Sequence, residues 1–266
     1  MNPSPPVEGV YDSHAHLADD AFEGSRDLII FRARQNGVLG IILPGDTLET
    51  SRKSLELARS CPDFLKAAVG LHPYDAKHYR DAVEIELRAL AADPLIVAVG
   101  EIGLDHRPAG DDPSPRDVQR EAFLRQLSLS ESLNLPAIIH CRNAYDEMIS
   151  LLAERPSRER PGVIHCFSGT AAQAEALAEM GYYIGFTGVI TFRNAEETRR
   201  AARSVPRDRL LIETDCPYLS PHPVRGKFPN EPANVRFVAD GLASCLGLPI
   251  DDLCRITSQN TIRLFG

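Results

Sequence analysis

The sequence predicts a (β/α)8 barrel, the TIM-barrel architecture, on the basis of three observations. Nearly continuous apolar runs such as GIILPG and LIVAVG recur along the chain, as expected of parallel strands that are buried on both faces. Segments with helical periodicity separate these runs, and strands that alternate with helices indicate a parallel sheet with right-handed crossovers. The chain has 266 residues, and one such barrel needs about 250.

Eight apolar runs qualify as strands, and helical segments separate them. The predicted strands are 8–13, 37–43, 64–70, 95–101, 136–141, 161–166, 182–187 and 209–214. The predicted helices are 25–36, 49–60, 79–92, 116–134, 143–154, 171–180 and 194–204, with a final helix at 250–264 that covers one end of the barrel. An open doubly wound sheet has the same local pattern, but the number of strands favours closure into a barrel.

Composition narrows the class of protein. We expect one domain over residues 1–266, with residues 1–8 as a flexible N-terminal extension. A net charge of −8 argues against a broad basic face that coats nucleic acid, although it allows a local cationic patch. The N-terminus lacks a secretory signal, no apolar run approaches the ~18 residues of a membrane span, and six cysteines form no dense disulfide framework. We therefore expect a cytoplasmic monomer that does not bind membranes.

Six potential metal ligands lie near the ends of five predicted strands. They are His14, His16, Glu101, His140, His165 and Asp215. His14 and His16 are two positions apart, so in an extended chain their imidazoles lie on one side and can chelate one ion. A single histidine on an apolar strand is more often a core residue than a ligand. Because the carboxyl ends of barrel strands meet at one face, six such residues predict a shared metal site.

Other polar residues near these strand ends have candidate roles. Asp12 and Glu213 point the same way as neighbouring ligands, so we expect them to orient the ligands from behind. His72 ends the third strand and is a candidate substrate contact. Cations near the barrel mouth are candidates for binding phosphate: Arg142, Arg225 and Lys227.

Three cysteines sit beside the candidate ligands: Cys141, Cys166 and Cys216. Strand alternation predicts that they face away from the site, toward the helices, as small buried side chains.

Nine segments resemble the TatD family of metal-dependent deoxyribonucleases, which belongs to the amidohydrolase-like superfamily. The segments keep the family's order and cover almost all of the chain after residue 9. They are DSHAHL at 12–17, GLHP at 70–73, GEIGLD at 100–105, IIHCRNA at 138–144, HCFSG at 165–169, GFTGVITFRNA at 185–195, ETDCPYL at 213–219, RGKFPNEP at 225–232 and TSQNTIRLFG at 257–266. The chain departs from the family after GLD, where His106 replaces the usual aromatic residue and a loop rich in proline and glycine follows.

The resemblance implies a TIM barrel with two divalent metal ions. His14, His16 and Asp215 would hold one ion, His140 and His165 would hold the other, and Glu101 would bridge them. The family hydrolyses DNA phosphodiesters, often from a 3′ end and with magnesium or another divalent ion. The histidine-rich ligand set suits zinc or manganese better than magnesium, which prefers oxygen ligands.

These inferences predict a 3′–5′ exonuclease on single-stranded DNA ends that uses a two-metal-activated water. Asp215 is the expected general base and then proton donor, and Glu101 sets the metal spacing. A hydrolase of small amides, lactones or phosphoesters is the alternative, because a fold does not determine its substrate. The acidic pair Asp111 and Asp112 in the loop 106–115 favours that alternative, since it would repel phosphate. A metal-bound protein without catalytic activity is a third hypothesis, which the complete ligand set disfavours.

Overall fold

The computed structural model describes residues 9–107 and 114–266. Its eight strands form one sheet in chain order, and each strand is parallel to the next. The strands are β1 Val10–Asp12, β2 Val38–Leu43, β3 Leu65–Val69, β4 Ile96–Asp105, β5 Ala137–Arg142, β6 Gly162–Ile164, β7 Tyr183–Phe186 and β8 Leu210–Ile212. The Ser13 amide donates to the Ile212 carbonyl, and an isolated parallel β-bridge joins Ala15 to Cys216. These contacts connect the β1 edge of the sheet to the β8 edge. The predicted (β/α)8 barrel is thereby confirmed.

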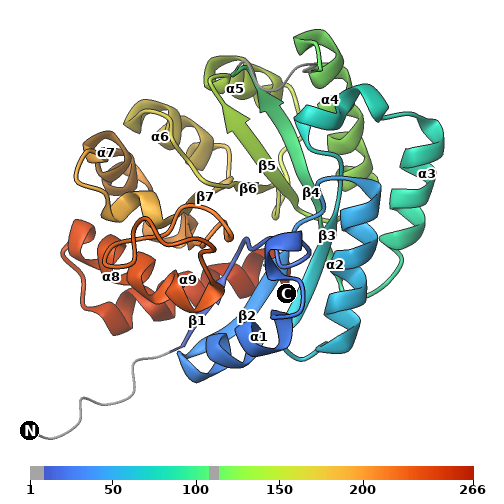
Figure 1. Cartoon of the computed structure of the whole chain (residues 1–266). Helices are drawn as coiled ribbons and strands as arrows, with labels where there is room; N and C mark the ends of the chain where they lie inside the picture. Colours follow the sequence, from blue (N-terminus) through green and yellow to red (C-terminus); the bar gives the residue numbers. More distant parts are fainter. Residues whose placement is uncertain (1–8, 108–113) are drawn as a thin grey trace, which may run out of the picture.

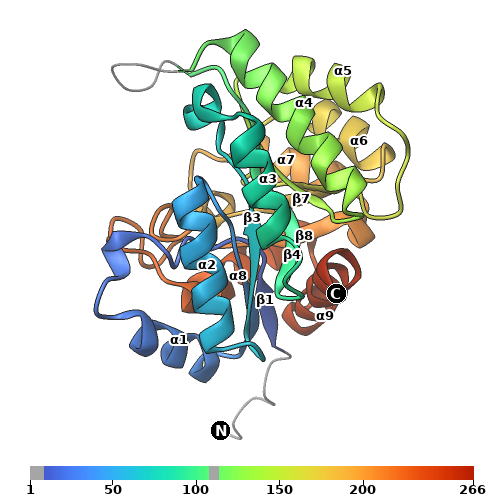
Figure 2. The same cartoon turned by 90° about the vertical axis from the view of Figure 1, so that its right-hand side faces the viewer.

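Nine α-helices surround the strands in the described residues (Figures 1 and 2). They are α1 Arg26–Gln35, α2 Leu48–Ser60, α3 Asp81–Leu90, α4 Arg116–Ser132, α5 Tyr145–Ala153, α6 Ala171–Glu179, α7 Glu196–Ser204, α8 Val235–Leu246 and α9 Ile250–Phe265. Local sequence sets several helix ends. Thr47 with Thr50 and Thr170 with Gln173 form capping boxes at the starts of α2 and α6. None of the described helices combines the length and the apolarity that crossing a membrane requires.

The structure contains one helix that the sequence did not lead us to predict, α8, which follows the long connection after β8. Val235, Val238 and Leu242 have helical spacing and are buried. Gly241 obscures this pattern, because glycine disfavours helix interiors. A Cβ at position 241 would lie 2.8 Å from the Thr191 side chain, so glycine there lets α8 pack closely on the short helix at Gly188–Thr191.

The fourth strand extends further than predicted. It continues through Glu101 to Asp105 beside β5, with Gly103 opposite His140. A Cβ on Gly103 would collide with the His140 carbonyl oxygen, so glycine permits this close approach. Glu101 therefore lies within a strand rather than at its end. The Glu101 carboxylate is therefore held on the longest strand of the barrel.

The last helix, α9, packs at the end of the barrel where the strands begin. Its Asn260 side chain donates to the carbonyl oxygen of Leu210, the first residue of β8. Leu264 and Phe265 join a buried cluster that draws on strands β2 to β8. This agrees with the expected covering of one end by the final helix. The opposite face, where the strands end, stays open for a site.

Candidate metal centre

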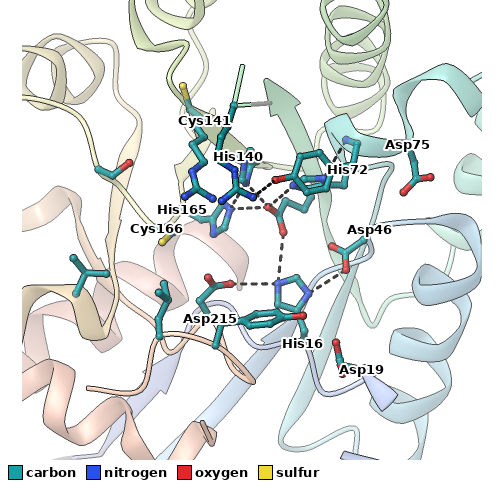
Figure 3. A pocket seen from close by; sticks show the side chains of 18 residues that line it. His16, Asp19, Asp46, His72, Asp75, His140, Cys141, His165, Cys166 and Asp215 are labelled. Atoms are coloured by element: carbon teal, nitrogen blue, oxygen red, sulfur yellow. Dashed lines mark hydrogen bonds and ion pairs between the residues drawn. The ribbon is translucent and has the colours of Figure 1, made fainter. Parts of the chain in front are cut away.

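The carboxyl ends of the strands surround a cavity of about 700 Å³ (Figure 3). Five of the six predicted ligands line it: His16, Glu101, His140, His165 and Asp215. The sixth, His14, is buried directly beneath them. Residues from widely separated parts of the chain thus converge at the face that the strand-end positions predicted.

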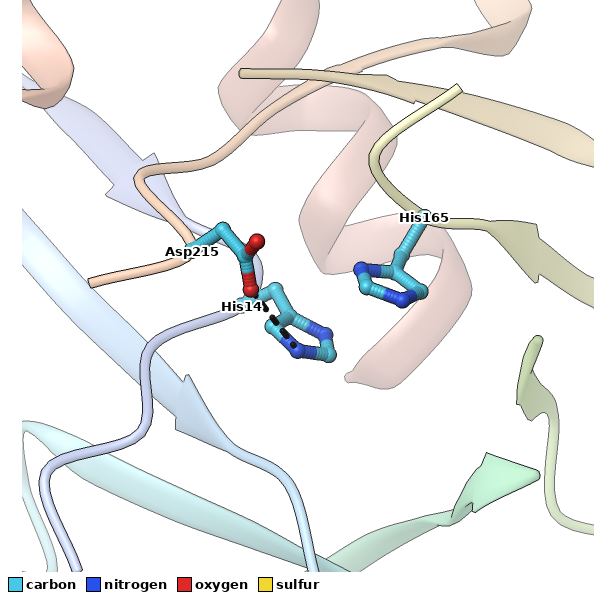
Figure 4. Close-up of side chains that lie close together, drawn as sticks. All are labelled: His14, His165 and Asp215. Atoms are coloured by element: carbon cyan, nitrogen blue, oxygen red, sulfur yellow. Dashed lines mark ion pairs between the residues drawn. The ribbon is translucent and has the colours of Figure 1, made fainter. Parts of the chain in front are cut away.

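The first two candidate ligands, His14 and His16, follow β1, and their rings lie close together. The Nε2 atoms of His14 and His16 are 3.0 Å apart. The His14 ring also stacks on that of His165, with centroids 4.1 Å apart and planes inclined by 9° (Figure 4). Burial opposes protonation of His16, but the Asp46, Asp215 and Glu101 carboxylates outweigh it and raise its pKa well above the usual value.

Glu101 lies between the two groups of histidines. Its Oε2 atom is 3.2 Å from His14 Nε2 and 3.6 Å from His16 Nε2. Its Oε1 atom is 2.8 Å from His140 Nδ1 and 2.7 Å from His165 Nε2. Only 3 % of this residue is exposed. Burial alone would raise the Glu101 pKa, yet the surrounding histidines hold it well below the ordinary value, so the carboxyl is ionised.

Asp215 completes the group of candidate ligands from the segment after β8. Its Oδ1 atom is 3.3 Å from His16 Nε2 and 3.7 Å from His14 Nε2. The residue adopts a left-handed backbone conformation, with φ 54°. Tyr218 donates its amide hydrogen to the Asp215 carbonyl (3.0 Å), which fixes the turn that presents the carboxylate.

Two carboxylates that sequence reasoning missed orient the histidines from behind. Asp105 Oδ2 is 3.0 Å from His140 Nε2. Asp46 Oδ2 is 3.2 Å from His16 Nδ1 (Figure 3). Burial would raise the Asp105 pKa, but hydrogen bonds from His140 and the Arg107 amide lower it to about 2. Asp46 follows the end of β2, so the strand-end criterion was a signal that could have found it.

The two residues expected to orient ligands accept hydrogen bonds from backbone amides and hydroxyl groups instead. Asp12 accepts hydrogen bonds from the Thr214 amide (2.9 Å) and the Thr214 hydroxyl (2.5 Å). Glu213 accepts from the Cys166 amide (2.5 Å), and its nearest imidazole contact, to His165 Nδ1, is 3.8 Å. Both carboxylates therefore hold the segments that carry candidate ligands, rather than the imidazole rings themselves.

The predicted substrate-binding residues occupy different places. His72 lines the cavity with Nε2 3.5 Å from Glu101 Oε1, and Arg142 lines it as well. Arg225 and Lys227 are exposed and do not line it. Arg107 lines the cavity, although it was not among the predicted site residues. The acidic pair at 111–112 lies outside the described residues.

Two of the neighbouring cysteines differ from expectation. Cys141 and Cys166 line the cavity, whereas the prediction placed them toward the helices. Cys166 follows the end of β6 and has φ 46°, so strand alternation no longer applies there. Cys216 is fully buried, as predicted for a small core side chain. Burial raises the pKa of the Cys166 and Cys216 thiols well above the ordinary value.

Fold and site together define a class of protein. A (β/α)8 barrel whose histidines and carboxylates converge at the carboxyl ends of the strands is the arrangement of a metal-dependent hydrolase. The sequence profile described as TatD related DNase matches residues 11–266. The chain therefore belongs to the TatD-related DNase family.

Individual relatives agree with this assignment. YabD of Bacillus subtilis, described as an uncharacterized metal-dependent hydrolase, is 38% identical over 256 residues, covering 96% of this chain and 98% of YabD. A 3′-5′ ssDNA/RNA exonuclease TatD of Erwinia tasmaniensis is 36% identical, covering 97% of this chain and 100% of that protein. The crystal structure of YjjV, a TatD homolog of Escherichia coli K12, superposes with a TM-score of 0.89 at 34% identity, covering 96% and 97% of the two chains. These findings confirm the predicted family and the predicted class of enzyme.

Proposed function

We propose that the protein removes nucleotides from the 3′ end of single-stranded DNA by hydrolysing phosphodiester bonds, with two divalent metal ions at the described centre. The name of the Erwinia tasmaniensis relative supports the substrate and the polarity. The observation that carries the two-ion proposal is the Glu101 carboxylate. Each of its oxygens faces a different pair of histidines. A carboxylate placed in this way can bridge two cations.

The donor set fits divalent cations. Asp46 accepts a hydrogen bond from His16 Nδ1, and Asp105 accepts one from His140 Nε2. In a neutral imidazole the opposite nitrogen then presents a lone pair, and in both rings that nitrogen faces Glu101. Potential ligand atoms lie within 4.8 Å of one another in overlapping groups, one of which contains His14, His16 and Glu101.

We assign one ion to the residues around β1 and β8 and the other to those of β5 and β6. The first would be held by His14, His16, Asp215 and Glu101, and the second by His140, His165 and Glu101. Imidazole ligands favour zinc or manganese over magnesium. When bound, such ions acidify water and neutralise charge on the phosphate. A monomer suffices, because one chain supplies every group of the centre.

His72 has a role distinct from the ligands, although it lies within reach of Glu101 and His140. Its Nδ1 atom accepts the Tyr74 amide hydrogen (3.2 Å). The Nε2 atom of the neutral ring therefore carries the proton and cannot also offer a lone pair to a metal. Burial, together with the charge of His140, lowers the His72 pKa to about 4, so the ring is neutral near pH 7. We assign His72 as a hydrogen-bond donor to a phosphate oxygen.

The remaining chemistry falls to groups around the cavity. Arg107 and Arg142 line it and present guanidinium groups to a phosphate. Asp215 takes a proton from the attacking water and returns it to the leaving oxygen, since its carboxylate borders the cavity beside His16. Asp215 thereby serves both as a ligand and as the proton carrier, whereas His72, Arg107 and Arg142 bind the phosphate.

The experiment follows a 5′-labelled single-stranded oligonucleotide through hydrolysis with manganese, zinc or magnesium. Progressive shortening from the 3′ end is the expected result, with slower shortening of a blunt duplex. Lactones and small phosphoesters form the comparison panel. Efficient turnover of a panel member, with the oligonucleotide left intact under all three metals, would refute the nuclease assignment in favour of the small-molecule alternative.

A further inference from the structure

Two large aromatic side chains are exposed in the segment that connects β8 to α8. Tyr218 is 52 % exposed and Phe228 is 66 % exposed. Their ring centroids are 6.2 Å apart, and the ring planes are inclined by 45°. Aromatic rings usually bury their surface, so an adjacent exposed pair indicates a binding surface. We call Tyr218 and Phe228 together the aromatic pair.

The aromatic pair starts at the metal centre and leads away from it. Tyr218 lines the cavity, and its amide donates to the carbonyl oxygen of Asp215. Asn230 ties the part of the segment that carries Phe228 to the part that carries Tyr218, because its side chain donates to the Tyr218 carbonyl (2.8 Å) and its amide donates to the Pro217 carbonyl (2.8 Å). Phe228 does not line the cavity and is more exposed than Tyr218, so it forms the outer end of the pair.

Positive charge accompanies the rings. Arg225 and Lys227 belong to the same segment and are exposed. The Arg225 guanidinium lies 4.0 Å above the Phe192 ring, which holds it in place. The acidic residue next in the segment, Glu231, is paired with Arg32 at 2.8 Å, so its charge is offset. Stacking surfaces flanked by cations match the bases and phosphates of a single strand.

We propose that the aromatic pair stacks on the unpaired bases next to the bond that is cleaved, while Arg225 and Lys227 contact the phosphates between them. This inference rests on the proposed nuclease function and specifies how its substrate is bound. A duplex hides the faces of its bases, whereas a single strand offers them to the rings. The surface therefore favours single strands of any sequence, because every base has a face to stack.

Equilibrium binding tests the proposal separately from catalysis. The probe is a fluorescein-labelled thymidine decamer with phosphorothioate linkages at its 3′ end, which slow hydrolysis, measured by anisotropy with the metal-loaded protein. A second decamer carries abasic sites next to the 3′ terminal nucleotide and keeps every phosphate. The variants are Phe228→Ala, Phe228→Leu, which keeps apolar bulk without a ring, and Phe228→Tyr, which keeps the ring. Ile85→Ala on α3 is the matched control, because Ile85 is 67 % exposed and lies outside the cavity.

We expect Phe228→Ala and Phe228→Leu to raise the Kd of the intact decamer by about 5- to 150-fold, the range measured for losing one stacked base. Phe228→Tyr and Ile85→Ala should stay near wild type, and the abasic decamer should bind wild type and Phe228→Ala alike. Equal loss of affinity for both decamers, or none for either, would overturn the proposal. Base-dependent binding without strand shortening by wild type would instead retain the aromatic pair and refute the nuclease function.

Discussion

Asp105 provides the sharpest test of the proposed metal centre. Its side chain accepts hydrogen bonds from His140 Nε2 (3.0 Å) and from the Arg107 amide (2.9 Å). In Asp105→Asn the amide oxygen can serve only one of these donors. If it keeps the Arg107 amide, the new NH2 group faces His140 Nε2 and forces the ring to accept there. The proton then moves to His140 Nδ1, the atom that faces Glu101 and His165.

The size of the effect follows from that tautomer change. A ligand nitrogen that carries a proton must lose it, or the ring must turn, before it can bind a cation. Replacing a partner of this kind costs about 10- to 100-fold in metal affinity, equivalent to about 1.4–2.8 kcal/mol. The loss should be confined to the ion held by His140 and His165, because Asp105 contacts neither His14 nor His16.

Competition with a chromophoric chelator measures both affinities. Asp105→Asn should show one weakened and one unchanged site, and nitrogen NMR of the imidazoles should report the changed tautomer of His140. Asp63→Asn is the matched control, since Asp63 is an exposed partner of Arg34 far from the cavity in the described structure. Two unchanged affinities in Asp105→Asn would refute the reasoning.

Three further outcomes are expected. Asp215→Asn keeps one potential ligand oxygen but removes the base, so kcat on single-stranded DNA should fall by about 10²–10⁴-fold while the ion held by His140 and His165 remains; activity within a few-fold of wild type would place the base elsewhere. Replacing both Arg225 and Lys227 with alanine should raise KM more than it lowers kcat, because exposed cations bind ground and transition states alike, and steady-state kinetics with the reverse pattern would contradict that role. Removing metal with a chelator should lower the Tm in a thermal melt, since the ions bind only the folded chain and contribute about 2.7 kcal/mol at 100-fold excess over Kd; an unchanged Tm would argue against bound ions.

The barrel and the convergence of the ligands were predictable because both depend on local patterns. Buried parallel strands produce continuous apolar runs, and the carboxyl ends of such strands must meet at one face. The pairing of His14 with His16 follows from a spacing of two residues, which the extended chain converts directly into neighbouring rings. The helix α8 could also have been predicted from the spacing of its apolar residues, but Gly241 weakened that helical pattern.

The amino-acid sequence by itself indicated the barrel and placed the six candidate ligands at its mouth, because the carboxyl ends of parallel barrel strands meet at one face. Only the tertiary structure decided which of them touch. Asp105 meets His140 because the extension of β4 runs beside β5, and Asp12 meets Thr214 because β1 and β8 close the barrel. Those contacts depend on strand register and closure between segments far apart in the chain. A change of one residue in register turns a side chain to the opposite face, and no local pattern encodes that choice.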